Sequence, residues 1–214
     1  MKTSNIIIAS TIGFVFLSTV WSIVESKNKL EDYIQHPEIN EAEILNLDHF
    51  KHLVISGEAD AQISIGENNS YQLVGSNQGE IIVKNDTLFI SEDSKVNITC
   101  ENLQSISLSG NASLRFNKFE SDYLMISAFD QSKITAYNST LNKLDLYTKK
   151  GARVIIHQFE IDTVNILATD YSRIGLTGKL EIVRGEVTGN SNLSVKGANN
   201  TQFSKKGNAT IHMN

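Results

Sequence analysis

The sequence predicts an all-β protein: a parallel, right-handed β-helix that follows an N-terminal signal or transmembrane helix. Three observations support this fold class. A turn motif recurs at almost constant spacing through the second half of the chain, apolar residues alternate with polar ones around each turn, and the 214 residues include a single proline. Every coil of a β-helix needs its N–H groups to bond to the next coil, so a scarcity of proline is typical of this architecture.

Residues 1–24 are predicted to be a signal peptide or a transmembrane anchor. Lys2 precedes an uncharged apolar run, 6–24, of 19 residues. A helix of that length rises 1.5 Å per residue and nearly spans a hydrocarbon core of about 30 Å. Cleaved signals share this layout, so both alternatives stay open. In either case we expect the rest of the chain to be exported, with membrane contact through residues 6–24.

The next segment, 25–46, is polar and acidic and contains Pro37, and we predict a linker there. The predicted β-helical domain then covers residues 47–214. Within it, residues 71–92 form a group of short strands, which we expect to cap the N-terminal end of the solenoid and cover its open edge.

Composition excludes several classes of function. The chain carries 19 Lys and Arg against 24 Asp and Glu, a formal net charge of −5, with no basic cluster, which argues against a nucleic-acid partner. The single cysteine, Cys100, excludes an internal disulfide framework and a cysteine zinc site, and we expect it to be buried. The five histidines are scattered and lack carboxylates at metal-binding spacing, so we expect no metal and no cofactor.

The repeat defines the coil. Apolar and small residues alternate with period two on both sides of each turn, which is the pattern of short strands. A further apolar point such as Phe119 gives each copy a third side, and three short sides in tandem copies of 18–20 residues are typical of a parallel β-helix. An antiparallel meander would not explain the constant spacing. The turn positions, spaced by 20, 20, 20, 19 and 18 residues, are Gly110, Asp130, Lys150, Asp170, Gly189 and Gly207.

The order of these segments resembles a known family. An exported N-terminus is followed by Phe50–Gly57 (FKHLVISG), Ala61–Gly66 (AQISIG), a strand group ending at Leu88–Ser91 (LFIS), and coils of the type SGNASL. This arrangement is similar to the autotransporter adhesin head domain, or GIN domain, of bacterial envelope proteins, over roughly residues 47–214. The resemblance implies an exported β-helical domain in Gram-negative bacteria and carries over no catalytic residues.

Three turn residues are candidates for chemistry. Asp130, Lys150 and Asp170 occupy equivalent positions in successive coils, so stacking at about 4.8 Å would align them as an ion-pair ladder. Two aspartates so placed would also suit an ion or ligand site, or the paired acids of a polysaccharide hydrolase. Aspartate favours such turns for local reasons as well.

These features favour a non-catalytic cell-envelope domain that presents a rigid face for adhesion or ligand binding. Envelope polysaccharide or a surface protein is the expected partner, because tyrosines and asparagines fall on outward positions. The alternatives are an enzyme that acts on polysaccharide through Asp130 and Asp170, and a scaffold that self-associates as a homo-oligomer through its last coil. The regular coils lack the long inserted loop that solenoid enzymes need, which favours binding. The outward tyrosines are Tyr123, Tyr137, Tyr147 and Tyr171.

Overall fold

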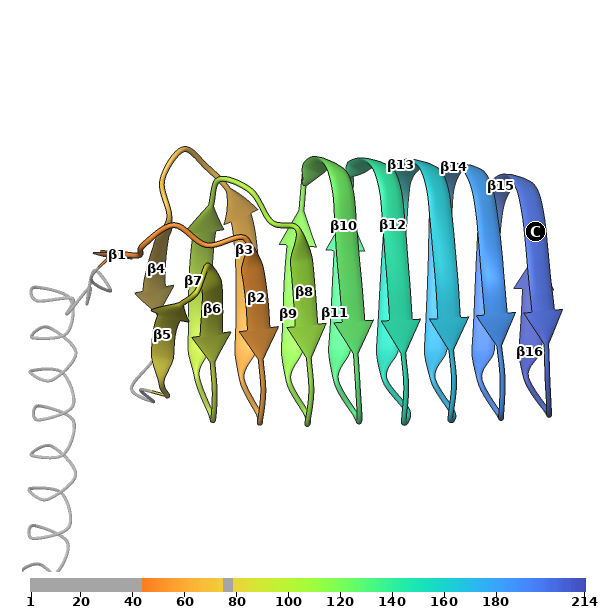
Figure 1. The fold of residues 1–214 in the computed structure, drawn as a ribbon, viewed down its shortest axis with the longest axis horizontal. Helices are drawn as coiled ribbons and strands as arrows, with labels where there is room; N and C mark the ends of the chain where they lie inside the picture. Colours follow the sequence, from red (N-terminus) through yellow and green to blue (C-terminus); the bar gives the residue numbers. More distant parts are fainter. Residues whose placement is uncertain (1–43, 75–78) are drawn as a thin grey trace, which may run out of the picture. The chain divides into compact units, whose positions relative to one another are not determined.

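The computed structural model describes residues 44–74 and 79–214, and these form a parallel β-helix, which confirms the predicted fold class (Figure 1). The predicted N-terminal segment, 1–24, and nearly all of the predicted linker lie outside the described residues. In the described ranges, no helix is long and apolar enough to cross a membrane.

Each coil contributes to two parallel ladders of strands, which we call the front and back ladders after the view in Figure 1. The front ladder consists, in spatial order, of β6 (Thr87–Ile90), β2 (His52–Ile55), β8 (Ser105–Leu108), β10 (Glu120–Ala128), β12 (Thr140–Thr148) and the C-terminal parts of β13 (Arg153–Ala168), β14 (Arg173–Val187) and β15 (Asn192–Lys205). The back ladder consists of β7 (Lys95–Cys100), β3 (Asp60–Ile65), β9 (Ser113–Asn117), β11 (Lys133–Tyr137), the N-terminal parts of β13, β14 and β15, and β16 (Thr210–Met213).

The core is a stack of inward-facing rows, as the period-two pattern predicts. Ile106, Ile126, Leu146 and Ile166 follow one another in register along the front ladder and are all buried. Aromatic rings fill the corners, where the Phe116 ring meets those of Phe119 and Phe159 edge-on at centroid distances of 5.9 and 6.4 Å.

Not every apolar residue that the alternation assigns to the core is buried: Ile65 is 40%, Ile182 39% and Met213 49% exposed, whereas Leu180, at the third side of the same coil as Ile182, is buried. The register between β13 and β14 shifts between His157 and Phe159, so the following coil turns this corner with one residue fewer and Ile182 lies opposite the outward Thr163.

The turns between the ladders explain the repeated sequence motif. Residues at the predicted turn positions have positive φ, including Gly110 at 73°, Asp130 at 60°, Lys150 at 59° and Asp170 at 53°. This left-handed conformation favours glycine, and among other residues Asp and Asn adopt it most readily. Two residues later every turn has a small buried side chain, because the tight bend leaves room for little more. These small residues are Ser94, Ala59, Ala112, Ser132, Ala152, Ser172, Ser191 and Ala209.

The first coils do not stack in chain order. His52 of β2 is paired with Thr87 of β6 on one side and with Ser105 of β8 on the other, so the coil of β2 and β3 lies between two coils that follow it in sequence. The strands of the group predicted at 71–92 therefore occupy two kinds of position. Its β6 is a regular coil strand, while β5 (Ile81–Lys84) pairs with β6 in antiparallel fashion.

Antiparallel strands line the end of the back ladder too. Strand β4 (Ser70–Leu73) pairs with β7, and β1 (Ile44–Asn46) pairs with β4. These short strands satisfy the outer edge of the first parallel coil, which would otherwise present unpaired N–H and C=O groups. Strand β1 falls inside the range 25–46 that the sequence marks as a linker.

The structure predicts that two glycines of β14 tolerate substitution very differently. A Cβ on Gly185 would run into the carbonyl oxygen of Ile166, whereas a Cβ on Gly175 meets nothing within 4 Å. We expect Gly185→Ala to destabilise the domain by about 2–3 kcal/mol through overpacking, and Gly175→Ala to change stability by less than about 1 kcal/mol. Urea unfolding followed by far-UV circular dichroism measures both, and equal unfolding midpoints for the two variants would contradict the close packing of coils at Gly185.

Candidate functional site

The three turn residues predicted as a ladder lie on successive coils with half-exposed side chains. Lys150 Nζ lies 3.5 Å from Asp130 Oδ1, and the Gly110 amide donates a hydrogen bond of 3.3 Å to Asp130 Oδ2. The Asp170 carboxylate pairs instead with Lys149 Nζ at 4.0 Å. The fold therefore brings Asp130 and Lys150 together, while Asp170 has a different partner. Such exposed ion pairs contribute at most about 1 kcal/mol to stability.

A more extensive network, not singled out by the sequence, lies on the front ladder. The Asp145 carboxylate at its centre accepts hydrogen bonds from Tyr123 Oη at 2.9 Å and Asn165 Nδ2 at 2.6 Å, and it pairs with Lys143 Nζ at 3.2 Å. Asn165 Oδ1 in turn accepts a hydrogen bond of 2.8 Å from Arg184 Nε. The network thus joins side chains from four neighbouring strands, β10, β12, β13 and β14.

Strand register explains why these side chains meet. Asp145 pairs with Asn165 across β12 and β13, and Asn165 pairs with Arg184 across β13 and β14, so the three stand in one outward row. Adjacent strands in a ladder lie about 4.8 Å apart, a distance that short polar side chains bridge directly. The 20-residue repeat could have revealed Asp145 and Asn165 as neighbours, but the diagonal reach of Tyr123 depends on its side-chain geometry.

The network alters the acidity of two of its members. Partial burial disfavours the charge of Asp145, but hydrogen bonds from Asn165, Tyr123 and Lys143 together outweigh it, so the pKa of this carboxyl is lowered. The pKa of Tyr123 is raised, first by desolvation and then by its hydrogen bond to Asp145. At neutral pH Asp145 is therefore a carboxylate and Tyr123 a neutral hydroxyl donor.

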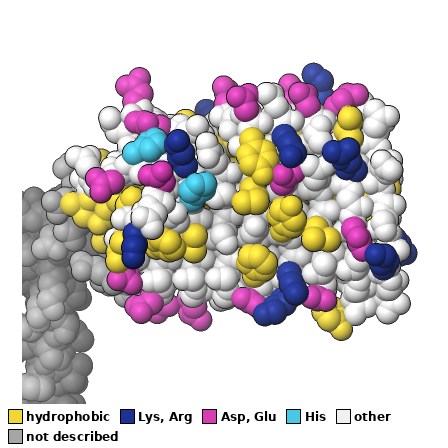
Figure 2. All heavy atoms as spheres, viewed as in Figure 1, with side chains coloured by type: hydrophobic (Ala, Val, Ile, Leu, Met, Phe, Trp, Pro, Cys, Tyr) yellow, Lys and Arg dark blue, Asp and Glu magenta, His cyan; other side chains and the backbone are white. Residues whose placement is uncertain are grey.

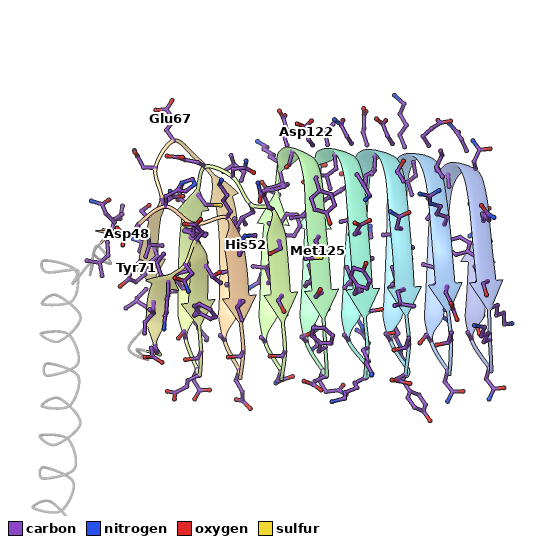
Figure 3. The ribbon with its side chains drawn as sticks, in the orientation of Figure 1. Asp48, His52, Glu67, Tyr71, Asp122 and Met125 are labelled. Atoms are coloured by element: carbon purple, nitrogen blue, oxygen red, sulfur yellow. The ribbon has the colours of Figure 1, made fainter. Side chains whose placement is uncertain are left out.

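Apolar side chains surround this network on the same face. Tyr123 is 36%, Tyr147 41% and Leu167 40% exposed, and the Lys143 ammonium lies 5.2 Å from the centroid of the Tyr123 ring. Figure 2 shows hydrophobic side chains gathered over the middle of this face with charged groups around them, and Figure 3 labels Met125 among them. The outward side of β10, β12, β13 and β14, centred on these residues, is called the network face below.

The other two outward tyrosines lie elsewhere. Tyr137 is on the back ladder, where its ring stacks on His157 at a centroid distance of 5.5 Å, and Tyr171 is at a turn and 66% exposed. The four tyrosines are outward-facing or at turns as predicted, but the fold brings only Tyr123 and Tyr147 onto the network face.

Two hollows open on or beside the network face. The first, with a volume of about 490 Å³, runs past Tyr147, Leu167, Arg184 and Phe203. The second, of about 740 Å³, is mostly polar and lies at the corner beside Tyr123. Its other lining residues are Asn102, Gln104, Glu120, Ser121, Asp122, Thr140 and Asn142.

The other residues considered for chemistry in the sequence are the cysteine and the histidines. Cys100 is buried as predicted, and burial, with a smaller contribution from the charge of Glu101, raises its pKa to about 12. His52 Nδ1 lies 2.8 Å from Ser105 Oγ, while His49 faces Asn69 and Glu101. In the ranges 44–74 and 79–214 no three His, Cys, Asp or Glu side chains are grouped so that they could hold a metal ion.

The lowered pKa of Asp145 predicts a pH-dependent contribution to stability. A carboxyl whose pKa is lower in the folded than in the unfolded state stabilises the fold above the unfolded value, about 3.9, and loses that contribution as the pH falls through the folded value. We expect Asp145→Asn to cost about 1–2 kcal/mol at pH 7, the value of charge-assisted hydrogen bonds, and much less at pH 3. Urea unfolding at the two pH values measures this.

Glu160→Gln is the control, because the ion pair that Glu160 forms with Lys179 is exposed. This variant should change stability by less than about 0.5 kcal/mol at pH 7. An Asp145→Asn penalty of the same size at pH 3 as at pH 7 would show that side-chain shape, and not charge, accounts for the effect.

Solved structures share this fold. A putative adhesin from Bacteroides fragilis is 18% identical, with a TM-score of 0.60, and the match covers 80% of this chain and 95% of that one. Putative adhesins from Parabacteroides merdae and Parabacteroides distasonis are 17% and 16% identical, with TM-scores of 0.55 and 0.53 and the same coverage. Among curated proteins, none is significantly similar in sequence.

The sequence pattern of one protein family covers most of the chain. The family described as "Putative auto-transporter adhesin, head GIN domain" matches residues 49–214. This range includes both ladders and the whole network face, and it agrees with the resemblance noted from the order of the segments. An adhesin-like family indicates a bacterial protein that is exported or displayed at the surface. The chain therefore belongs to the family of auto-transporter adhesin head GIN domains.

Proposed function

We propose that this protein is an exported, non-catalytic envelope protein whose β-helical domain binds glycan through the network face. The single observation that carries the proposal is the Asp145 network, which holds polar groups from four strands in fixed positions between exposed tyrosine rings. The apolar run at residues 6–24 supports export and attachment to, or passage through, the membrane.

The chemistry of the network face suits saccharides. Sugar rings present C–H groups that pack on aromatic rings, and hydroxyls that exchange hydrogen bonds with carboxylate and amide groups. Tyr123 and Tyr147 supply the rings, and Asp145 and Asn165 supply the polar groups. Because these polar side chains already hold one another, little conformational entropy is lost when a ligand binds.

The surroundings of the turn aspartates favour binding over hydrolysis. Asp130 and Asp170 each pair with a lysine, and neither lines the two hollows of the network face. A glycosidase needs two carboxyls that flank a bound sugar, so that one protonates the leaving group while the other attacks or activates water. The side chains of Asp130 and Asp170 at the turns are about half exposed.

The test is saturable binding of the full chain, purified in mild detergent, to polysaccharide fractions of bacterial envelopes. We expect Tyr147→Ala to weaken binding about tenfold, since an aromatic contact is worth roughly 1–1.5 kcal/mol. Tyr171→Ala is the matched control, because this tyrosine is exposed but lies outside the network face, and it should leave binding unchanged.

The same samples test catalysis through the release of new reducing ends. Saturable binding without release supports the proposal. Release of reducing ends that disappears in Asp130→Ala and Asp170→Ala would replace it with a hydrolase, and equal binding by the Tyr147→Ala and Tyr171→Ala variants would remove the network face from the binding site.

A further inference from the structure

We infer that the first of the two hollows, called the groove beside Arg184 below, binds the carboxylate of an acidic saccharide. This inference rests on the proposed function, because it assigns a ligand class to one part of the network face. It depends on the position of one guanidinium group, the charges around it and the shape of the groove.

Arg184 is oriented but not neutralised. Its Nε donates a hydrogen bond of 2.8 Å to Asn165 Oδ1, and Asn165 is fixed in turn because its Nδ2 donates to Asp145. Within the described part of the chain, no carboxylate forms an ion pair with Arg184. The nearest acid along the strand, Glu186, is paired with Lys206 at 2.7 Å.

An unpaired guanidinium with a fixed orientation is a selective anion site. The group has five N–H donors in a planar fork, of which Asn165 uses one, so pairs of donors remain for a carboxylate. The fork matches the two oxygens of a carboxylate better than a lysine ammonium does. The chain as a whole carries a net charge of −5, so attraction of an anion must come from a local positive group such as this one.

The groove gives the ligand a surface to pack on. Its volume of about 490 Å³ lies in the usual range for small-ligand sites, about 300–1,000 Å³. Tyr147, Leu167 and Phe203 supply apolar surface, and Gln202 adds a polar amide. Gly185, without a side chain, contributes only backbone to the lining. A charged group at the edge of an apolar, amide-bearing groove matches a uronic acid, which combines a carboxylate with a sugar ring.

The experiment measures binding of the full chain to trigalacturonate and to the same trisaccharide after its carboxyls are reduced to alcohols. We expect the wild type to bind trigalacturonate at least about tenfold more tightly than the reduced sugar. Arg184→Gln should abolish that preference, while Arg184→Lys should keep part of it, because lysine retains the charge but lacks the fork. Arg173→Gln is the control, since it removes the same charge from the back-ladder part of the same strand.

Each outcome has a definite meaning. Loss of the preference in Arg184→Gln, with a wild-type thermal unfolding midpoint and no loss in Arg173→Gln, supports the acidic-saccharide subsite. Equal binding of both trisaccharides, or an unchanged preference in Arg184→Gln, overturns the inference but leaves glycan binding by the network face intact if Tyr147→Ala still weakens binding to envelope polysaccharide. Failure of every saccharide to bind overturns both.

Discussion

Backbone hydrogen bonds between successive coils are the interaction on which the rest of this structure depends. The amides of Lys133, Arg153 and Arg173 each donate a hydrogen bond of 2.9 Å to a carbonyl of the preceding coil, after the same turn each time. These bonds hold the coils in a register of 20 residues, so that equivalent side chains form straight rows on both sides of each ladder. Rows that point inward make the core, and rows that point outward make surfaces with a defined order of chemical groups.

The network face shows how much follows from that register. Asp145 meets Asn165 because the coil is 20 residues long, and Asn165 meets Arg184 across a coil of 19 because the missing residue is taken up at the corner after His157. An irregularity at the corner thus preserves alignment on the front ladder. A polar group that would be mobile alone on a surface is held by its neighbours in the row, which is what a binding face needs.

Membership of an adhesin-like family and the Asp145 network are independent observations. The family match says what kind of domain this is, and the likeness to the solved structures shows the fold. The arrangement of tyrosines, amides and Arg184 on the network face gives the proposal of glycan binding its specific residues. The turn residues Asp130 and Lys150, both in the left-handed conformation, form an exposed ion pair that stabilises the fold little.

The sequence by itself determined the coil, because hydrogen bonding along a β-helix requires a constant repeat and period-two burial, both visible in the spacing from Gly110 to Gly207. Tertiary structure alone decided the order of the first coils, where the strand of His52 lies between those of Thr87 and Ser105. It also decided which polar residues meet, since the reach of Tyr123 to Asp145 and of Arg184 to Asn165 depends on side-chain direction. Local periodicity records which face a residue occupies, whereas contacts between distant segments depend on how the whole chain stacks.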